Sequence, residues 1–300
     1  MIAYSKIIIL LTCSCREGYA LLEKCVTKIS EKRKGLSGFR YKEDRWPVCI
    51  VLALTVLDFV LYFTVSNVGL LIGYYLLMII PKGVICAWNH HHQHLFTFRQ
   101  AYLNRGLEFV YALHTGVTTH LWRLHHVLGH HLNFLDQKED ESRWKRKDGT
   151  QMGMIEYTLD VALTAYPRGY QVGKKHPKQL PTFLLYTALT FAAVAVLVWF
   201  NPVAGLLLFV LPMITSLLFT AYVTYEHHSG LDTQNEFEAS YNNLDPLFNR
   251  LTGNLGYHTA HHHKQGVHWS KLPALHAKIE DKIPEYLYQK SILTRVFLGG

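Results

Sequence analysis

Four long apolar runs dominate the hydropathy pattern of the chain. They cover residues 48–65, 69–88, 181–200 and 203–225, so each run is 18 to 23 residues long. A bilayer core about 30 Å thick needs about 20 helical residues to cross it. Buried helices of water-soluble domains are usually shorter than this. The pattern therefore predicts an all-α, polytopic membrane protein with four transmembrane helices.

The links between these runs predict two helical hairpins. Residues 66–68 join the first pair of runs, and Asn201 and Pro202 join the second pair. Such short links can only reverse the chain direction. The N-terminal arm, the central segment 89–180 and the C-terminal segment 226–300 are therefore expected on one side of the membrane.

The basic residues indicate which side this is. Of the 30 Lys and Arg residues, only Lys82 lies within the four runs. By the positive-inside rule, the side with the basic residues, which includes both termini, is cytoplasmic. The net charge of +8 then follows from the topology and does not indicate nucleic-acid binding. We divide the chain into a basic cytoplasmic arm, residues 1–46, and a membrane domain, residues 47–300.

Several weaker features complete the organisation. Segments 106–122 and 152–166 are apolar but contain polar residues, and we expect each to form an interfacial or shallow re-entrant helix. Asp58 lies deep in the first run, where pairing with a Tyr or Thr of a neighbouring helix is expected. The five cysteines form no CxxC pair, which favours free thiols on a cytoplasmic face.

Histidines carry the candidate chemistry of this sequence. The chain contains 19 of them, and most fall in four clusters. The clusters read NHHHQH from Asn89, HHVLGHH from His125, EHH from Glu226 and HTAHHH from His258. The first and third directly follow an apolar run, so the topology brings all four to the same membrane face.

The spacing within the clusters is typical of metal-binding helices. His90 and His94, like His126 and His130, are four residues apart and would share a helix face. Nine imidazoles are too many for one ion and suit two ions with four or five ligands each. Iron would add redox chemistry, whereas zinc would support hydrolysis. The best-placed candidates are His90, His94, His126, His130, His131, His258, His261 and His262, and the short EHH cluster adds one more.

The register within the histidine runs stays open at this point. The alternative ligands are His91, His92, His125, His228 and His263. Ligating imidazoles usually donate their second N–H to a carboxylate or carbonyl oxygen. The candidates for such partners are Asp136, Asp140, Glu226, Asp232, Asp245 and Asn254.

The set of motifs resembles the integral-membrane fatty-acid desaturase and hydroxylase superfamily. HxxxH, HxxxHH and HxxHH follow one another in that family's order over residues 46–276. Residues 126–131 and 226–231 are similar to motifs of membrane alkane hydroxylases, and residues 254–273 are closer to acyl desaturases. His125 stands where the alkane hydroxylases tend to have an acidic residue, and the chain has fewer spans than they do.

The resemblance implies a membrane-bound, O2-dependent di-iron oxidoreductase acting on long fatty-acyl chains, most simply a fatty-acid desaturase. It implies that two iron ions are held by His90, His94, His126, His130, His131, His227, His258, His261 and His262. A separate electron donor of ferredoxin, rubredoxin or cytochrome b5 type, with its reductase, would supply electrons. The sequence contains neither a GxGxxG nucleotide motif nor the HPGG haem signature of a fused carrier.

Other interpretations stay open. A hydroxylase or a terminal-alkene-forming decarboxylase would use the same scaffold, because hydrogen abstraction is common to all three reactions. A histidine-rich metal transporter would place its ligands near the bilayer midplane, but the apolar runs contain no His. An inactive homologue would keep the metal site without turnover. The sequence does not indicate chain length, head group, regiospecificity or oligomeric state.

Overall fold

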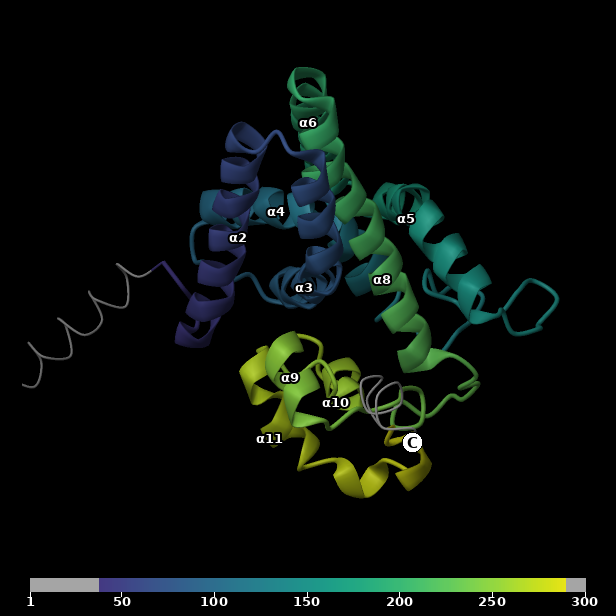
Figure 1. The fold of residues 1–300 in the computed structure, drawn as a ribbon. Helices are drawn as coiled ribbons and strands as arrows, with labels where there is room; N and C mark the ends of the chain where they lie inside the picture. Colours follow the sequence, from purple (N-terminus) through teal and green to yellow (C-terminus); the bar gives the residue numbers. More distant parts are fainter. Residues whose placement is uncertain (1–37, 290–300) are drawn as a thin grey trace, which may run out of the picture.

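The computed structural model describes residues 38–289, and this part of the chain is built from helices (Figure 1). Within that range no strand forms, and the β features are isolated bridges such as Phe39–Phe98. The all-α prediction is therefore confirmed. Most of the N-terminal arm, with Cys13, Cys15 and Cys25, lies outside the described residues. Cys49 and Cys86 are free thiols, as expected.

Four helices are long and apolar enough to cross a membrane, which confirms the predicted number of spans. Their outer faces carry large apolar side chains: Phe63 is 75% exposed, Leu77 73% and Trp199 82%. Such extended apolar surface is unfavourable in water and fits contact with lipid. The helices are α2 (Arg45–Thr64), α3 (Val68–His94), α6 (Leu180–Phe200) and a composite helix made of α7 (Pro202–Gly205), η3 (Leu206–Val210) and α8 (Leu211–His228).

The two hairpins form as predicted, and an asparagine begins the second helix of each. The Asn67 side chain accepts a hydrogen bond from Leu70 N at 3.1 Å, and the Asn201 side chain accepts one from Ala204 N at 3.2 Å. These caps satisfy backbone N–H groups that have no intrahelical partner. The charge-free turns are thus fixed by local hydrogen bonds.

Two of the long helices extend beyond the apolar runs. Helix α3 continues past Trp88 to His94, and α8 continues past Tyr225 to His228. The first and third histidine clusters therefore lie on the last turns of these helices. The backbone hydrogen bonds of two long, packed elements hold them in place.

A buried polar group ties the bundle together inside the apolar zone. Asp58 Oδ1 accepts a hydrogen bond from the expected kind of partner, Tyr74, at 2.7 Å, and Lys82 Nζ lies 2.8 Å from Asp58 Oδ2. Lys82 also donates to the carbonyl of Leu208 at 3.1 Å. In a regular helix that carbonyl would accept from residue 212, but Pro212 has no N–H. The lysine therefore satisfies a carbonyl that the proline leaves free.

Segment 106–122 does not form the single interfacial helix that the sequence suggested. Helix α4 (Ala101–Thr115) packs against α3 and α8 and ends at Gly116, which has a left-handed φ of 66°. A Cβ on Gly116 would lie 2.5 Å from the carbonyl oxygen of Met213, so only glycine allows this approach. Helix α5 (Met154–Lys175) covers the second interfacial prediction and also packs on α8.

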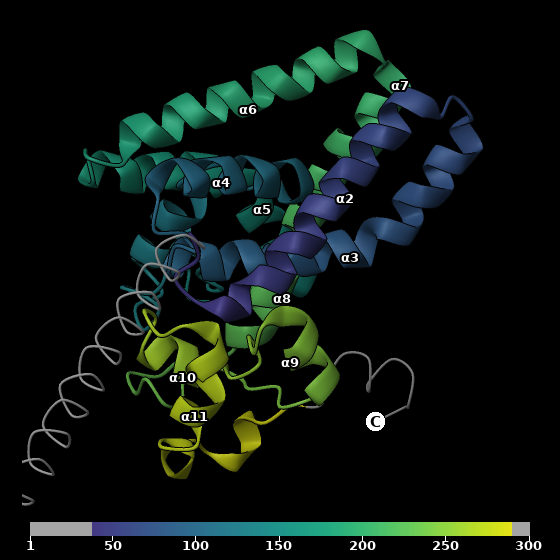
Figure 2. The same ribbon diagram turned by 90° about the vertical axis from the view of Figure 1, so that its left-hand side faces the viewer.

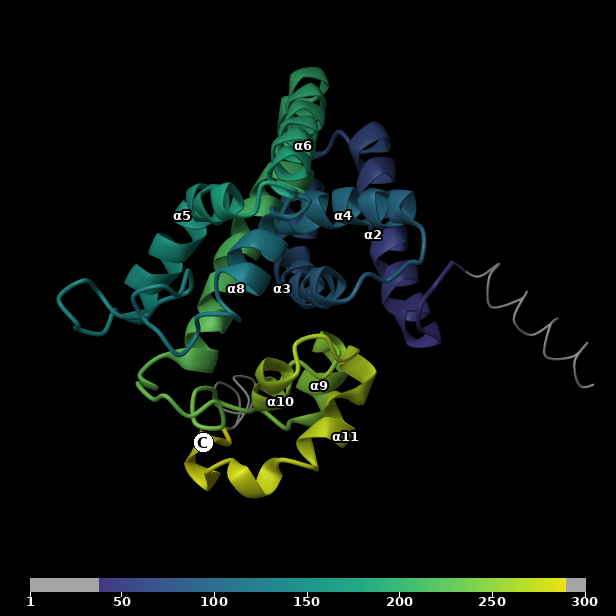
Figure 3. The ribbon, with the colours of Figure 1, turned by 180° about the vertical axis from the view of Figure 1, so that it is seen from behind.

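The C-terminal part gathers at one end of the long helices, as Figures 2 and 3 show. Its own small core includes Ala260, Ile279, Ile283 and Leu287. Its elements are α9 (Pro246–Thr252), α10 (His258–His263), α11 (Leu272–His276) and the short helices η4 (Trp269–Lys271), η5 (Glu280–Lys282) and η6 (Glu285–Leu287). Two further short helices are η1 (Lys42–Asp44), before α2, and η2 (Arg123–Leu128), between α4 and α5.

Candidate metal centre

The four histidine clusters meet where α3 and α8 reach the C-terminal part. The first cluster ends α3, the second lies on η2 and the turns after it, EHH ends α8, and the last forms α10. Among the described residues, two groups of buried or half-buried histidines bring their ring nitrogens close enough to hold a metal ion.

The first group contains five histidines whose ligand atoms all lie within 4.8 Å of one another. The Nε2 atoms of His90 and His126 are 2.8 Å apart, those of His94 and His90 3.1 Å, and those of His131 and His126 3.0 Å. The ring of His261 completes the group, with its centroid 4.5 Å from that of His94.

These distances fit a shared cation. Two imidazole nitrogens bound to one ion at about 2.1 Å and at right angles are about 3.0 Å apart. A neutral imidazole carries only one N–H, so the chain of close Nε2 contacts cannot be satisfied throughout by hydrogen bonds. In addition, the Nδ1 atoms of His90 and His131 and Nε2 of His261 are buried and have no hydrogen-bond partner among the described residues.

The second group lies beside the first and contains His130, His228 and His262. The Nε2 atoms of His130 and His228 are 3.3 Å apart, and Nε2 of His258 lies 3.0 Å from that of His228. We therefore count His258 with this group. The rings of His131 and His262 stack at 4.0 Å, so the two groups are in direct contact.

Hydrogen bonds to the far side of two rings orient the second group. His130 Nδ1 donates to Asp140 Oδ1 at 2.8 Å, and His228 Nδ1 donates to the carbonyl of Ala239 at 2.9 Å. With the proton on Nδ1, the Nε2 lone pair of each ring faces the centre of the group, as metal binding requires. Asp140 is a predicted orienting residue, and it contacts a histidine of the second group as expected.

The structure assigns the histidines of each cluster to the two groups in a way that α-helical spacing does not predict. His126 and His130 were expected to share one helix face, but His126 and His131 belong to the first group and His130 to the second. The reason is local. Residues 123–128 form a π-helix, and His131 N donates to the carbonyl of His126, five residues back. In α10, the adjacent His261 and His262 likewise point to different groups.

His227 lies outside both groups, and its neighbour His228 takes the place expected for it. The ring of His227 stacks on that of His258 at 3.9 Å and lines a large cavity. The motif EHH does not indicate which of the two histidines faces the histidine groups, because this depends on the rotation of α8 about its own axis. The eight other predicted ligands all lie in the two groups or, for His258, in contact with the second.

The remaining alternative ligands have other partners or positions. His91 Nε2 donates to the carbonyl of Thr252, and His92 Nδ1 lies 2.9 Å from Thr97 Oγ1. His263 pairs with Glu236, and His125 lines a small cavity behind His126. Two of the other predicted orienting residues act elsewhere, since Asp232 pairs with Lys145 and Asp245 accepts from Phe248 N at the start of α9.

Burial favours the neutral form of five histidines of the site. It lowers the pKa values of His126, His131, His258, His261 and His262 well below 6.5, and neighbouring imidazoles lower them further. Gathering protonated imidazoles in such a space would be costly. Their lone pairs are therefore free to bind a cation at neutral pH.

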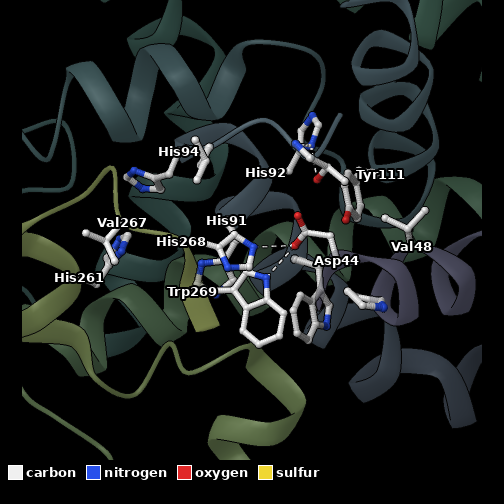
Figure 4. Close-up of a pocket in the computed structure, with 14 residues that line it drawn as sticks. Asp44, Val48, His91, His92, His94, Tyr111, His261, Val267, His268 and Trp269 are labelled. Atoms are coloured by element: carbon white, nitrogen blue, oxygen red, sulfur yellow. Dashed lines mark hydrogen bonds and ion pairs between the residues drawn. The ribbon is translucent and has the colours of Figure 1, made fainter. Parts of the chain in front are cut away.

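A contact between the two ends of the described chain supports the first group from outside (Figure 4). Asp44 Oδ1 accepts hydrogen bonds from His268 Nε2 at 3.0 Å and from Trp269 Nε1 at 2.8 Å. The Trp269 ring packs edge-on against Trp88, the residue directly before the first histidine cluster. Sequence analysis did not single out Asp44 or His268. Because 224 residues separate them, no local pattern connects them.

A cavity of about 240 Å³ reaches the metal-binding groups from the apolar zone. Ile80, Gly83 and Ala87 of α3 line one side of it, and Phe219 and Val223 of α8 line another. The rings of His90, His126, His228 and His258 lie at its inner end. Its size and apolar walls suit part of an aliphatic chain.

Comparison with known proteins agrees with this geometry. No curated protein and no solved structure matches the chain significantly. The profile of the fatty acid desaturase family, in contrast, matches residues 32–292, which include all four spans and every histidine cluster. The chain therefore belongs to the fatty acid desaturase family.

Proposed function

We propose that the chain is a membrane-bound, O2-dependent di-iron oxidoreductase that acts on fatty-acyl chains, most simply as a desaturase. Family membership supports an oxidoreductase of the desaturase and hydroxylase type. The single observation that carries the finer proposal is the pair of adjacent histidine groups at the inner end of an apolar cavity.

The two groups would each hold one iron ion. His90, His94, His126, His131 and His261 would bind the first, and His130, His228, His258 and His262 the second. Imidazole is a common ligand of iron, and the two bound irons would supply the redox chemistry and the activation of O2. This assignment uses His228 in place of His227.

The protein itself positions the reactants and excludes water. Asp140 and the carbonyl of Ala239 fix the rings of His130 and His228. The cavity between α3 and α8 would hold the acyl chain extended, with one C–H segment against the histidine groups. Except for the half-buried His94, the proposed ligands are buried, so bulk water has little access to the reacting segment.

The membrane orientation follows from charge. We place the histidine groups and both termini on the cytoplasmic side, where a soluble or membrane-anchored one-electron carrier can reach them. The basic run 143–147 is one candidate contact for an acidic carrier or for anionic lipid. In the structure Lys145 and Arg146 of this run already pair with Asp232 and Glu156.

Product analysis tests the proposal. The chain is expressed in a host beside a His130→Ala control, and lipids and hydrocarbons are compared by mass spectrometry. A new internal double bond is the expected result. An alcohol, or a terminal alkene with one carbon fewer, would instead show the hydroxylase or the decarboxylase.

Metal analysis of the purified protein tests the site independently of the product. About two irons per chain and O2 uptake with reduced carrier and lipid support the enzyme. Bound zinc without O2 uptake would show a transporter or another metal protein, and bound iron without O2 uptake would show an inactive homologue.

A further inference from the structure

A second, smaller cavity lies on the other side of the His126 ring. It measures about 40 Å³ and lies between η2, α5 and α8. Its apolar lining includes Leu121, Val161, Ala162, Ala165, Leu217 and Ala221. Four residues line both this cavity and the larger one, and so lie between the two spaces: Trp122, His126, Thr220 and Thr224.

The lining of the small cavity offers few polar partners. The hydroxyl groups of Thr220 and Thr224 donate to the carbonyls of Ser216 and Thr220, one turn back in α8, and so are already engaged. Nε2 of His125 and Nε1 of Trp122 are two buried lining nitrogens without a hydrogen-bond partner among the described residues, and most of the remaining wall is apolar. A cavity with mainly apolar walls tends to stay dry.

We propose that this cavity holds O2 next to the first metal-binding group, and this inference rests on the proposed function. The space is too small for an acyl chain but large enough for a diatomic molecule. O2 is apolar and dissolves better in hydrocarbon than in water, so dry apolar walls favour it over water. His126 is a proposed iron ligand, and its ring forms part of the wall.

The arrangement assigns the two substrates to two separate spaces. The acyl chain lies in the larger cavity and O2 waits in the smaller one, with His126 and Trp122 between them. The small residues Ala162, Ala165 and Ala221 keep the second space open. Larger side chains at these positions would fill it without touching the wall of the acyl cavity.

Gas binding tests the proposal without turnover. Crystals of the complete protein are pressurised with xenon, whose anomalous scattering locates apolar gas sites. We expect xenon between α5 and α8 in the wild type and its loss in Ala165→Leu. Ala162→Val is a smaller replacement that serves if Ala165→Leu does not fold. Ordered water in the wild-type cavity, or xenon excluded from it, would overturn the proposal.

Steady-state kinetics with reduced carrier give the second readout. Ala165→Leu should raise the KM for O2 severalfold and leave the KM for the lipid unchanged. Val223→Phe, which narrows the larger cavity, should do the reverse. If the wild type takes up O2 but Ala165→Leu keeps its KM for O2, this inference alone is wrong. If the wild type takes up no O2, the proposed function fails and the inference fails with it.

Discussion

Asp140 accepts a hydrogen bond from Nδ1 of His130 at 2.8 Å, and both side chains are buried. The carboxylate also accepts from Ser142 N at 2.7 Å, so its own position is fixed. Such outer contacts typically change metal affinity by about 10- to 100-fold. Asp140→Asn should therefore weaken binding at the second group by about that factor, measured by competition with a chelator.

The exposed Asp136, four residues earlier, provides the matched control. Its carboxylate accepts from Lys138 N in a turn and contacts no metal-binding histidine. Asp136→Asn should leave metal affinity unchanged. Equal losses in the two variants would mean that Asp140 acts through the fold of the loop and not through His130.

His227 and His228 give a second matched pair. His228 belongs to the second group, whereas His227 stacks on His258 and faces the large cavity. His228→Ala should reduce bound metal from about two ions per chain to about one, measured by elemental analysis. His227→Ala should keep both ions. The opposite result would restore the assignment that the sequence first suggested.

The buried pair Asp58–Lys82 makes a prediction about stability. Removing one partner of a buried ion pair typically costs about 3–5 kcal/mol, because it leaves the other charge unpaired. Asp58→Asn and Lys82→Met should each lower the melting temperature in detergent sharply. The double variant should recover most of the loss, because it removes both charges.

An exposed ion pair serves as the control for this experiment. Lys175 and Glu139 lie 3.8 Å apart, but their side chains are 75% and 62% exposed. Exposed ion pairs of this kind contribute little to the free energy of unfolding. Glu139→Gln should therefore leave the melting temperature nearly unchanged. A double variant of Asp58 and Lys82 as unstable as the single variants would show that shape, and not charge, holds this part of the bundle.

Glu108 predicts a pH dependence of stability. Burial raises the pKa of Glu108 from 4.5 to about 7, although Arg105 beside it acts in the opposite direction. Between pH 4.5 and 7 the folded chain keeps a proton that the unfolded chain has lost. The contribution of Glu108 to the free energy of unfolding is therefore most favourable at low pH. It falls by about 3 kcal/mol as the pH rises through that window.

Glu108→Gln isolates this effect. The amide of the substituted side chain does not titrate between pH 4.5 and 7.5. The histidines titrate alike in the wild type and in the variant, so the difference between the two isolates Glu108. Melting temperatures are measured from pH 4.5 to 7.5, and the wild type should lose stability relative to the variant as the pH rises. Parallel curves would show that Glu108 ionises normally in the folded protein.

Much of the fold could be predicted because membrane helices follow directly from run length and charge. The four runs, the two short turns and the pairing of Asp58 with a tyrosine needed only local information. The involvement of Lys82 in that pair was not predicted. The lysine also contacts the carbonyl of Leu208, 126 residues away in the chain, which only the packing of the bundle brings near.

The site shows the limit of helical spacing more sharply. The clusters correctly placed histidines directly after two of the apolar runs, where α3 and α8 end. Spacing assumes a regular helix, however, and the π-helix at residues 123–128 breaks that assumption. As a result His131, and not His130, lies with His126 in the first group. The rotation of α8, which places His228 inward, is set by its packing on α3 and α5 and is not encoded in the motif.

The position of α10 near the end of the chain determines when the two histidine groups can be completed during synthesis. Both metal-binding groups need a histidine from this helix, which follows the last membrane span. A growing chain therefore cannot complete either group before all four helices have entered the bilayer. The contact of Asp44 with His268 then joins the two ends of the domain. Under the proposed function, the ions would therefore be bound only late in biogenesis, after α10 has been made.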